Sequence, residues 1–109
     1  MKTVWIGLAK IVPHAENNQL GDAKGAFVNV LACVEDQASY CSAVRNALKD
    51  YEFDVLSIED IDVFSERLKT HKVSENLVTL SEEVNTSGNV RFGTFYSFDD
   101  NTIGRDLSN

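Results

Sequence analysis

The chain of 109 residues is poor in basic side chains. Ten lysines and arginines stand against 17 aspartates and glutamates, which gives a formal net charge of −7 with the histidines neutral. The cations are scattered along the chain, whereas proteins that bind nucleic acid or anionic membranes gather them on one surface. We therefore expect neither nucleic acid nor a membrane among the partners. An acidic surface instead suits solubility or the attraction of a basic protein.

Cysteine, proline and long apolar segments are also scarce. The two cysteines, Cys33 and Cys41, lack the short spacing and further ligands of a zinc site, so we expect buried thiols, no metal and no cofactor. No window approaches the ~18 apolar residues of a membrane-spanning helix, and we recognise no secretory signal. These absences favour a cytoplasmic protein with reduced thiols. A single proline and six glycines exclude a collagen-like or low-complexity chain.

What the chain does contain is an ordinary share of apolar residues, 43%, which is enough for one hydrophobic core. The length indicates a single domain over residues 1–109, because domains commonly hold about 100–150 residues. Residues 99–109 are polar, and we expect them to form a flexible tail. The polar segment 13–24 is long for a hairpin connection, so it is expected to be either mobile or functional.

Four segments have the patterning of β-strands. They are rich in β-branched and aromatic residues and are bounded by polar stretches. These segments are residues 3–12, 26–34, 53–61 and 89–98. In the segment 26–34 both the odd-numbered and the even-numbered positions are mainly apolar. We therefore expect a central strand covered on both faces, or on one face by a partner. Gly93 in the last segment marks a bulge or a close approach.

Helical patterning occupies the intervening segments. Apolar residues at i, i+3, i+4 and i+7 spacing predict a helix over residues 37–51, with Asp36 as its N-cap. A short helix is expected to follow the third strand. A further helix is predicted over 75–86, beginning after Ser74 and ending at Gly88.

The resulting order, β-β-α-β-α-β, predicts an α+β two-layer sandwich. We expect a mixed four-stranded sheet, with a parallel crossover from the second to the third strand and the helices packed on one face. In its element types this arrangement resembles the ferredoxin-like and ACT-like folds, although their hairpin stands at a different place in the order. Such folds host many unrelated functions, so the architecture alone selects none.

One candidate surface is a sheet face without helices. If the helices cover one face, strand alternation leaves Trp5, Ile11, Arg91 and Phe95 on the other. Aromatic and aliphatic side chains on an uncovered face are typical of self-association. No catalytic constellation is recognised. Our leading hypothesis is therefore a small non-enzymatic binding or regulatory domain that forms a homodimer through its sheet.

A second candidate surface is acidic. Glu59, Asp60 and Asp62 gather where the third strand leads into the short helix. Such a cluster can steer and dock a basic protein partner. One alternative hypothesis is therefore an inhibitor of a basic partner, of the bacterial immunity or antitoxin type. Another interpretation is a solvated strand exit whose carboxylates face a helix N-terminus.

A third hypothesis is a small enzyme. His14 in the 13–24 segment is a candidate general base, and the Glu59 and Asp60 carboxylates are a candidate acid/base pair. Neither a nucleophile elbow nor a glycine-rich phosphate loop accompanies them. The balance favours a protein that is not an enzyme, with ordinary surface side chains at these positions.

Overall fold

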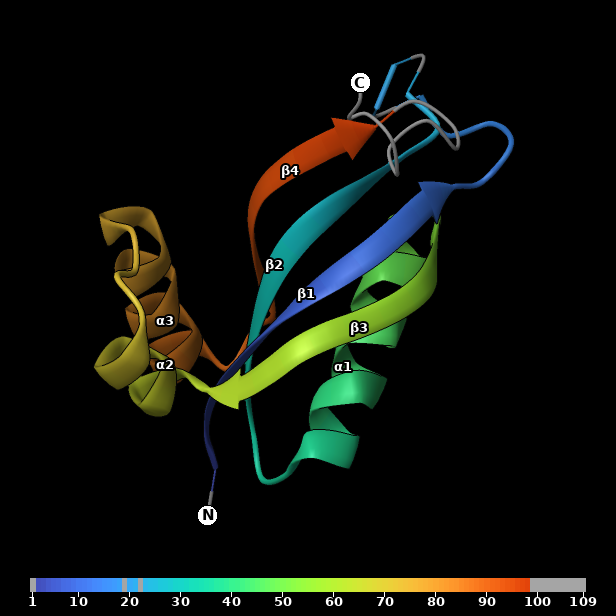
Figure 1. Ribbon diagram of the computed structural model, residues 1–109. Coiled ribbons are helices and arrows are strands. Elements are labelled where there is room, and N and C mark those ends of the chain that lie inside the picture. The colour runs from blue at the N-terminus through green and yellow to red at the C-terminus, as the bar shows by residue number, and fades with distance from the viewer. Residues whose placement is uncertain (1, 19, 22, 99–109) are drawn as a thin grey trace.

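The computed structural model describes residues 2–18, 20–21 and 23–98, so the predicted tail over 99–109 lies outside the described residues (Figure 1). Four strands and three helices follow one another along the chain. They are β1 (Thr3–Pro13), β2 (Gly25–Val34), α1 (Gln37–Asp50), β3 (Phe53–Val63), α2 (Phe64–Thr70), α3 (Glu75–Ser87) and β4 (Arg91–Phe98). The α+β class and the predicted elements are confirmed, with bounds that differ by one or two residues.

The sheet is antiparallel throughout, which corrects the predicted mixed sheet. Its strand order is β3-β1-β2-β4. Because the hairpin places β1 beside β2, α1 carries the chain across β1, and β3 then pairs with the far side of β1 (Figure 1). The two strands joined by α1 run in the same direction without being neighbours. The likeness to ferredoxin-like folds is therefore limited to the element types.

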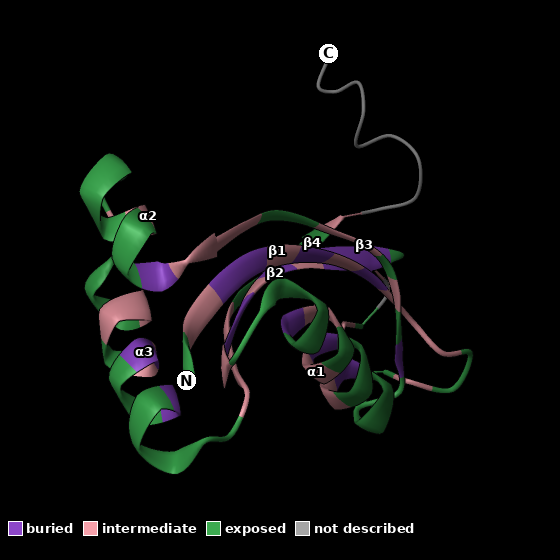
Figure 2. Ribbon diagram, turned by 90° about the horizontal axis from the view of Figure 1, so that it is seen from below, coloured by how far each residue is buried: buried purple, intermediate pink, exposed green. Residues whose placement is uncertain are grey.

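The helices cover both faces of the sheet, so the expectation of one helical layer was wrong. On one face, α1 packs over the fully buried Ile11 and Val28. On the other face, α2 and α3 cover one end, where Ile6, Leu31 and Val84 belong to a second buried cluster. Figure 2 shows α1 beneath the arched sheet and the α2–α3 pair at its other end. The physical reason is that β1 and β2 are apolar on both parities, and each face therefore needs a cover.

Tyr40 anchors α1 to the sheet. Its side chain is fully buried, and its hydroxyl donates a hydrogen bond to the carbonyl oxygen of Val30 at 2.7 Å. Gly7 in β1 makes room for the ring, because a Cβ there would lie 2.7 Å from the Tyr40 hydroxyl. Burial raises the pKa of Tyr40 far above its ordinary value, since desolvation penalises the phenolate.

The predicted helix caps are confirmed. Asp36 accepts a hydrogen bond from the backbone N–H of Ser39 at 2.8 Å, and this bond lowers the pKa of its carboxyl group. The Ser74 hydroxyl accepts from the backbone N–H of Leu77 at 3.3 Å. Gly88 ends α3 with a φ of 78°, the left-handed conformation that glycine adopts without strain.

Candidate functional site

The two edge strands of the sheet differ in composition. β3, at one edge, carries four acidic residues and two interruptions of its pairing with β1. Asp60 lies within one of these interruptions, between the paired residues Glu59 and Asp62, and has a φ of 55°, in the left-handed region. Charges and bulges of this kind keep an exposed edge from pairing with another chain. The β3 edge is therefore protected.

β4, at the opposite edge, is much less protected. Residues 92–98 (FGTFYSF) contain four aromatic rings, no charge and no proline. Among the described residues, no strand pairs with the outer side of β4. The Phe98 carbonyl accepts from the Lys24 N–H and so points toward β2. Alternation along the strand then directs the backbone groups of Ser97 and Phe95 outward, where they can bond to another strand.

A bulge in β4 changes which residues share a face. Phe92 lies opposite Val30 and Phe95 opposite Val28, so two residues of β4, Gly93 and Thr94, stand against one residue of β2, Asn29. The extra residue shifts the alternation by one position and brings both phenylalanines to the α1 face. Simple alternation had placed them on opposite faces. The one signal for this bulge in the sequence was Gly93.

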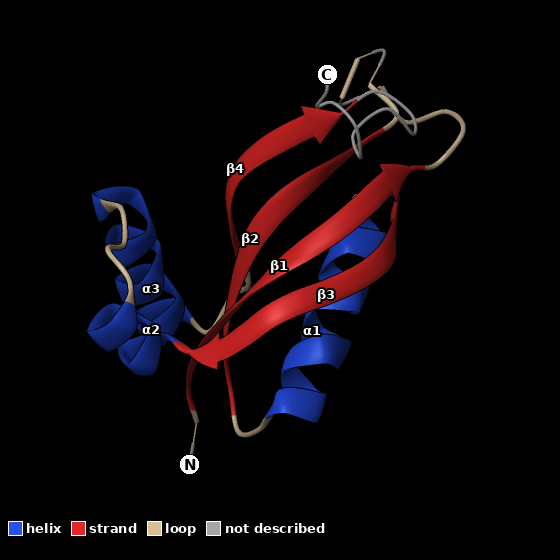
Figure 3. Ribbon diagram, in the orientation of Figure 1, coloured by secondary structure: helices blue, strands red, loops and turns tan. Residues whose placement is uncertain are grey.

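An apolar pocket opens beside β4 on the α1 face. Its volume is about 150 Å³, and it is lined by Leu48, Tyr51, Phe53, Phe92 and Phe95. The rings of Phe92 and Phe95 lie 6.1 Å apart, and Tyr51 meets Phe92 edge to face at 5.7 Å. The pocket exists because α1 packs mainly against β2 and β3 and leaves β4 uncovered on this face (Figure 3), whereas α3 packs against β4 from the other face. Together with the β4 backbone it forms a surface that we call the aromatic edge.

The four residues expected on one uncovered face lie in different environments. Ile11 is fully buried under α1, and Trp5 packs against the same cluster. The indole N–H of Trp5 has no hydrogen-bond partner among the described residues. Arg91 forms an ion pair with Glu83 of α3 at 3.3 Å. Phe95 is the one apolar member at the surface, with 37% of the residue exposed, and it belongs to the aromatic edge.

Arg67 binds one of the three residues of the predicted acidic patch, so the patch is not a single cluster of free carboxylates. The Nε of Arg67 donates to the carboxylate of Asp62 at 2.8 Å, and its Nη2 donates to the carbonyl oxygen of Asp60. Asp62 is therefore part of an ion pair between β3 and α2, while Glu59 and Asp60 are exposed on the strand. Sequence reasoning missed Arg67, because its link to Asp62 depends on the turn from β3 into α2.

His14 lies at the opposite end of β3 from Glu59 and Asp60. Its Nε2 is 3.1 Å from Oδ1 of Asp54, in an open groove of about 590 Å³. Five or six positions along β3 separate Asp54 from Glu59 and Asp60, or roughly 16–20 Å at about 3.3 Å per residue. The candidate base and the candidate carboxylate pair are thus two separate places on the surface.

The segment after β1 is attached to the turn between α1 and β3. The side-chain amide of Asn17 donates to the carbonyl oxygens of Tyr51 and Glu52, both at 2.9 Å. The backbone N–H of His14 also donates to Glu52 at 2.9 Å. These bonds hold the first half of the 13–24 segment over the turn, and its role as a functional loop stays a prediction.

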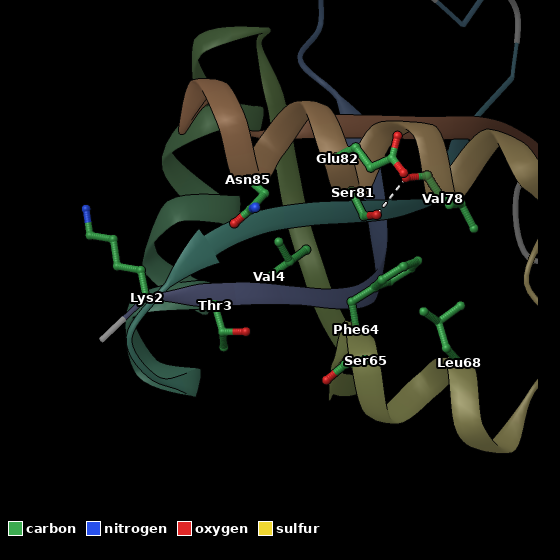
Figure 4. Close-up of a pocket in the computed structure, with 10 residues that line it drawn as sticks. All are labelled: Lys2, Thr3, Val4, Phe64, Ser65, Leu68, Val78, Ser81, Glu82 and Asn85. Carbon is green, nitrogen blue, oxygen red and sulfur yellow. Dashed lines mark hydrogen bonds between the residues drawn. The ribbon is translucent and has the colours of Figure 1, made fainter.

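A further cavity, of about 340 Å³, lies between the start of β1, α2 and α3 (Figure 4). Phe64, Leu68 and Val78 contribute apolar side chains to it. The hydroxyl of Ser81 donates to the carbonyl oxygen of Val78 at 2.6 Å, within α3. Polar side chains, among them Lys2, Glu82 and Asn85, also line the cavity, so it combines apolar and polar surface.

Cys33 and Cys41 are free and partly buried. Within residues 2–18, 20–21 and 23–98, no three His, Cys, Asp or Glu side chains are placed to hold a metal ion. None of the described helices has the length and apolar character needed to cross a membrane.

Comparison with known proteins found no relative: no family model, no curated protein and no solved structure matches the chain. Its function has to be inferred from its own surfaces.

Proposed function

We propose that the chain is a small non-enzymatic binding domain that self-associates through its sheet, with β4 as the associating strand. The observation that carries the proposal is the difference between the two sheet edges. β3 has acidic side chains and bulges that discourage pairing, whereas residues 92–98 of β4 have no charge and expose aromatic rings.

The charge of the chain favours a second copy as the partner at this edge. Two identical surfaces that meet about a twofold axis present the same charges to each other, so a self-associating surface has to be neutral or self-complementary. With a net charge of −7 on each copy, most surfaces repel their equivalents. The stretch 92–98 is uncharged, and antiparallel pairing of β4 with itself would join two sheets into one.

The apolar groups at the aromatic edge supply a driving force. In the pocket, Tyr51 is 53% exposed and Phe95 is partly exposed; Tyr96, whose side chain lies on the other face of β4, is 59% exposed. Covering apolar surface of this kind stabilises association by about 25 cal/mol per Å² before the entropic cost of binding. Strand pairing would add backbone hydrogen bonds to the same contact.

Two lysine variants, one on each sheet edge, test the proposal. Thr94→Lys places a charge on β4, and Leu56→Lys places the same charge on β3; both positions are exposed. Each change makes the net charge less negative and so weakens the general repulsion between copies. In sedimentation velocity we expect the unmodified chain and Leu56→Lys to form dimers, and Thr94→Lys to be a monomer.

Circular dichroism on the same samples establishes that each variant is folded. A monomeric unmodified chain at its highest soluble concentration would contradict the proposal. Equal loss of the dimer in both lysine variants would also contradict it, because the contact would then not depend on β4.

A further inference from the structure

We infer that the two copies pair with Phe95 of one β4 directly opposite Phe95 of the other, so that these rings close both aromatic pockets. This inference rests on the proposed self-association and goes beyond it, because it specifies the register of the pairing and the occupant of the pocket.

Strand geometry restricts the register. Directly opposed residues on antiparallel strands point to the same face of the sheet. Phe95 lies on the α1 face, opposite Val28, and Tyr96 lies on the other face, opposite Phe27. A symmetric register centred between Phe95 and Tyr96 would oppose residues from different faces, and it is excluded. Two registers centred on an exposed aromatic residue remain, with Phe95 or with Tyr96 opposite itself.

Burial decides between these two registers. Phe95 forms the rim of the apolar pocket and has no polar atom for water to bind. When it lies opposite itself, the two rings are cross-strand neighbours, with Cβ atoms about 4.5–5.5 Å apart. The two pockets then form one apolar stripe that includes Tyr51 and Phe92 of each copy. When Tyr96 lies opposite itself, Phe95 lies opposite Ser97 and its ring has no aromatic partner. The Tyr96 hydroxyl gains nothing from this register, because water can form the same hydrogen bonds with it.

The backbone and the surrounding space agree with the Phe95-centred register. The Phe98 carbonyl points toward β2, so alternation directs the N–H and C=O of Phe95 to the free edge. Two opposed Phe95 residues can therefore exchange both backbone hydrogen bonds. Figure 3 shows α1 behind β1 and β3 and away from β4, and α1 packs mainly against β2 and β3.

Disulfide trapping tests the register while the Phe95 ring stays in place. In the Phe95-centred register, position 94 of one copy opposes position 96 of the other. Thr94→Cys and Tyr96→Cys are therefore introduced separately, in a background with Cys33→Ala and Cys41→Ala, and the two chains are mixed under mild oxidation. Opposed positions meet the geometry of a disulfide, with Cα atoms about 4.4–6.8 Å apart.

We expect the mixed disulfide to predominate over the statistical mixture, as weighed by intact mass under non-reducing conditions. A disulfide in the Tyr96→Cys chain alone would overturn the register and would leave the self-association standing. A dimer seen by sedimentation without either disulfide would overturn pairing through β4. Sedimentation of the reduced background chain as a monomer would overturn the proposed function itself.

Discussion

The ring of Phe53, at the first position of β3, lies 6.2 Å from the ring of Phe95 on β4. β1 and β2 stand between these strands in the sheet. With about 4.8 Å between neighbouring strands, a flat sheet would hold them roughly 14 Å apart. The arch of the sheet over α1 brings side chains of its two edges together and builds the apolar pocket between them (Figure 2).

Phe53 and Tyr51 line the same pocket but differ in burial, and we expect their truncation to act differently. Phe53 is 2% exposed, so Phe53→Ala should lower the free energy of unfolding by about 3–5 kcal/mol through the cavity it leaves. Tyr51 is exposed, so Tyr51→Ala should cost about 1 kcal/mol or less while weakening the dimer. Urea unfolding and sedimentation measure the two effects. Equal losses of stability would mean that Phe53 is not a core residue.

Salt should strengthen self-association. Each copy carries a net charge of −7, while the β4 stretch 92–98 contributes no ion pair to the contact. Raising the ionic strength from about 0.01 M to about 0.15 M shortens the Debye length from about 30 Å to about 8 Å and screens the repulsion between copies. We expect the dissociation constant to fall across this range in sedimentation equilibrium. A dimer that weakens with salt would point to ion pairs and away from β4.

Tyr40 should make stability depend on alkaline pH. Burial raises its folded-state pKa above that of an unfolded tyrosine, which is about 10. Its contribution is therefore complete below about pH 10 and is lost as pH rises further, because the unfolded chain releases the proton first. Tyr40→Phe should cost about 1–3 kcal/mol at neutral pH, since it removes the buried hydrogen bond to the Val30 carbonyl.

The same variant should also show a shallower alkaline decline. Urea midpoints measured at neutral pH and between about pH 9 and 11 compare the two chains across the range in which tyrosine titrates. Parallel declines in the two chains would assign the alkaline sensitivity to other groups.

Asp60 and Asp62 should differ in what they contribute to folding. Asp62→Asn removes the carboxylate from Arg67, whose side chain is only 15% exposed, and we expect a loss of about 1 kcal/mol. Asp60 is exposed with a φ of 55°, so Asp60→Gly should be neutral or stabilise by up to about 1 kcal/mol by relieving the left-handed backbone. Thermal unfolding measures both. A destabilising Asp60→Gly would show that the Asp60 side chain has a structural role.

Local patterns in the sequence were sufficient for the elements and their caps. Asp36, Ser74 and Gly88 each act on backbone groups within a few positions of themselves, so a short window of sequence contains the cause. The apolar character of β2 on both parities likewise indicated an interior strand before any pairing was known. These features are local, and tertiary structure did not overrule them.

By itself, then, the sequence determined the α+β class, the elements and their caps. Tertiary structure decided which strands pair and what covers each face. Alternation states which residues of one strand share a face, but it does not state which helix covers that face, so Ile11 was expected at the surface and lies beneath α1. A single bulge placed Phe92 and Phe95 on the same face of the sheet, where simple alternation predicted opposite faces. The arch of the sheet then brought Phe53 beside Phe95. The aromatic edge depends on these non-local contacts, because its residues come from three elements that meet only after the sheet has formed.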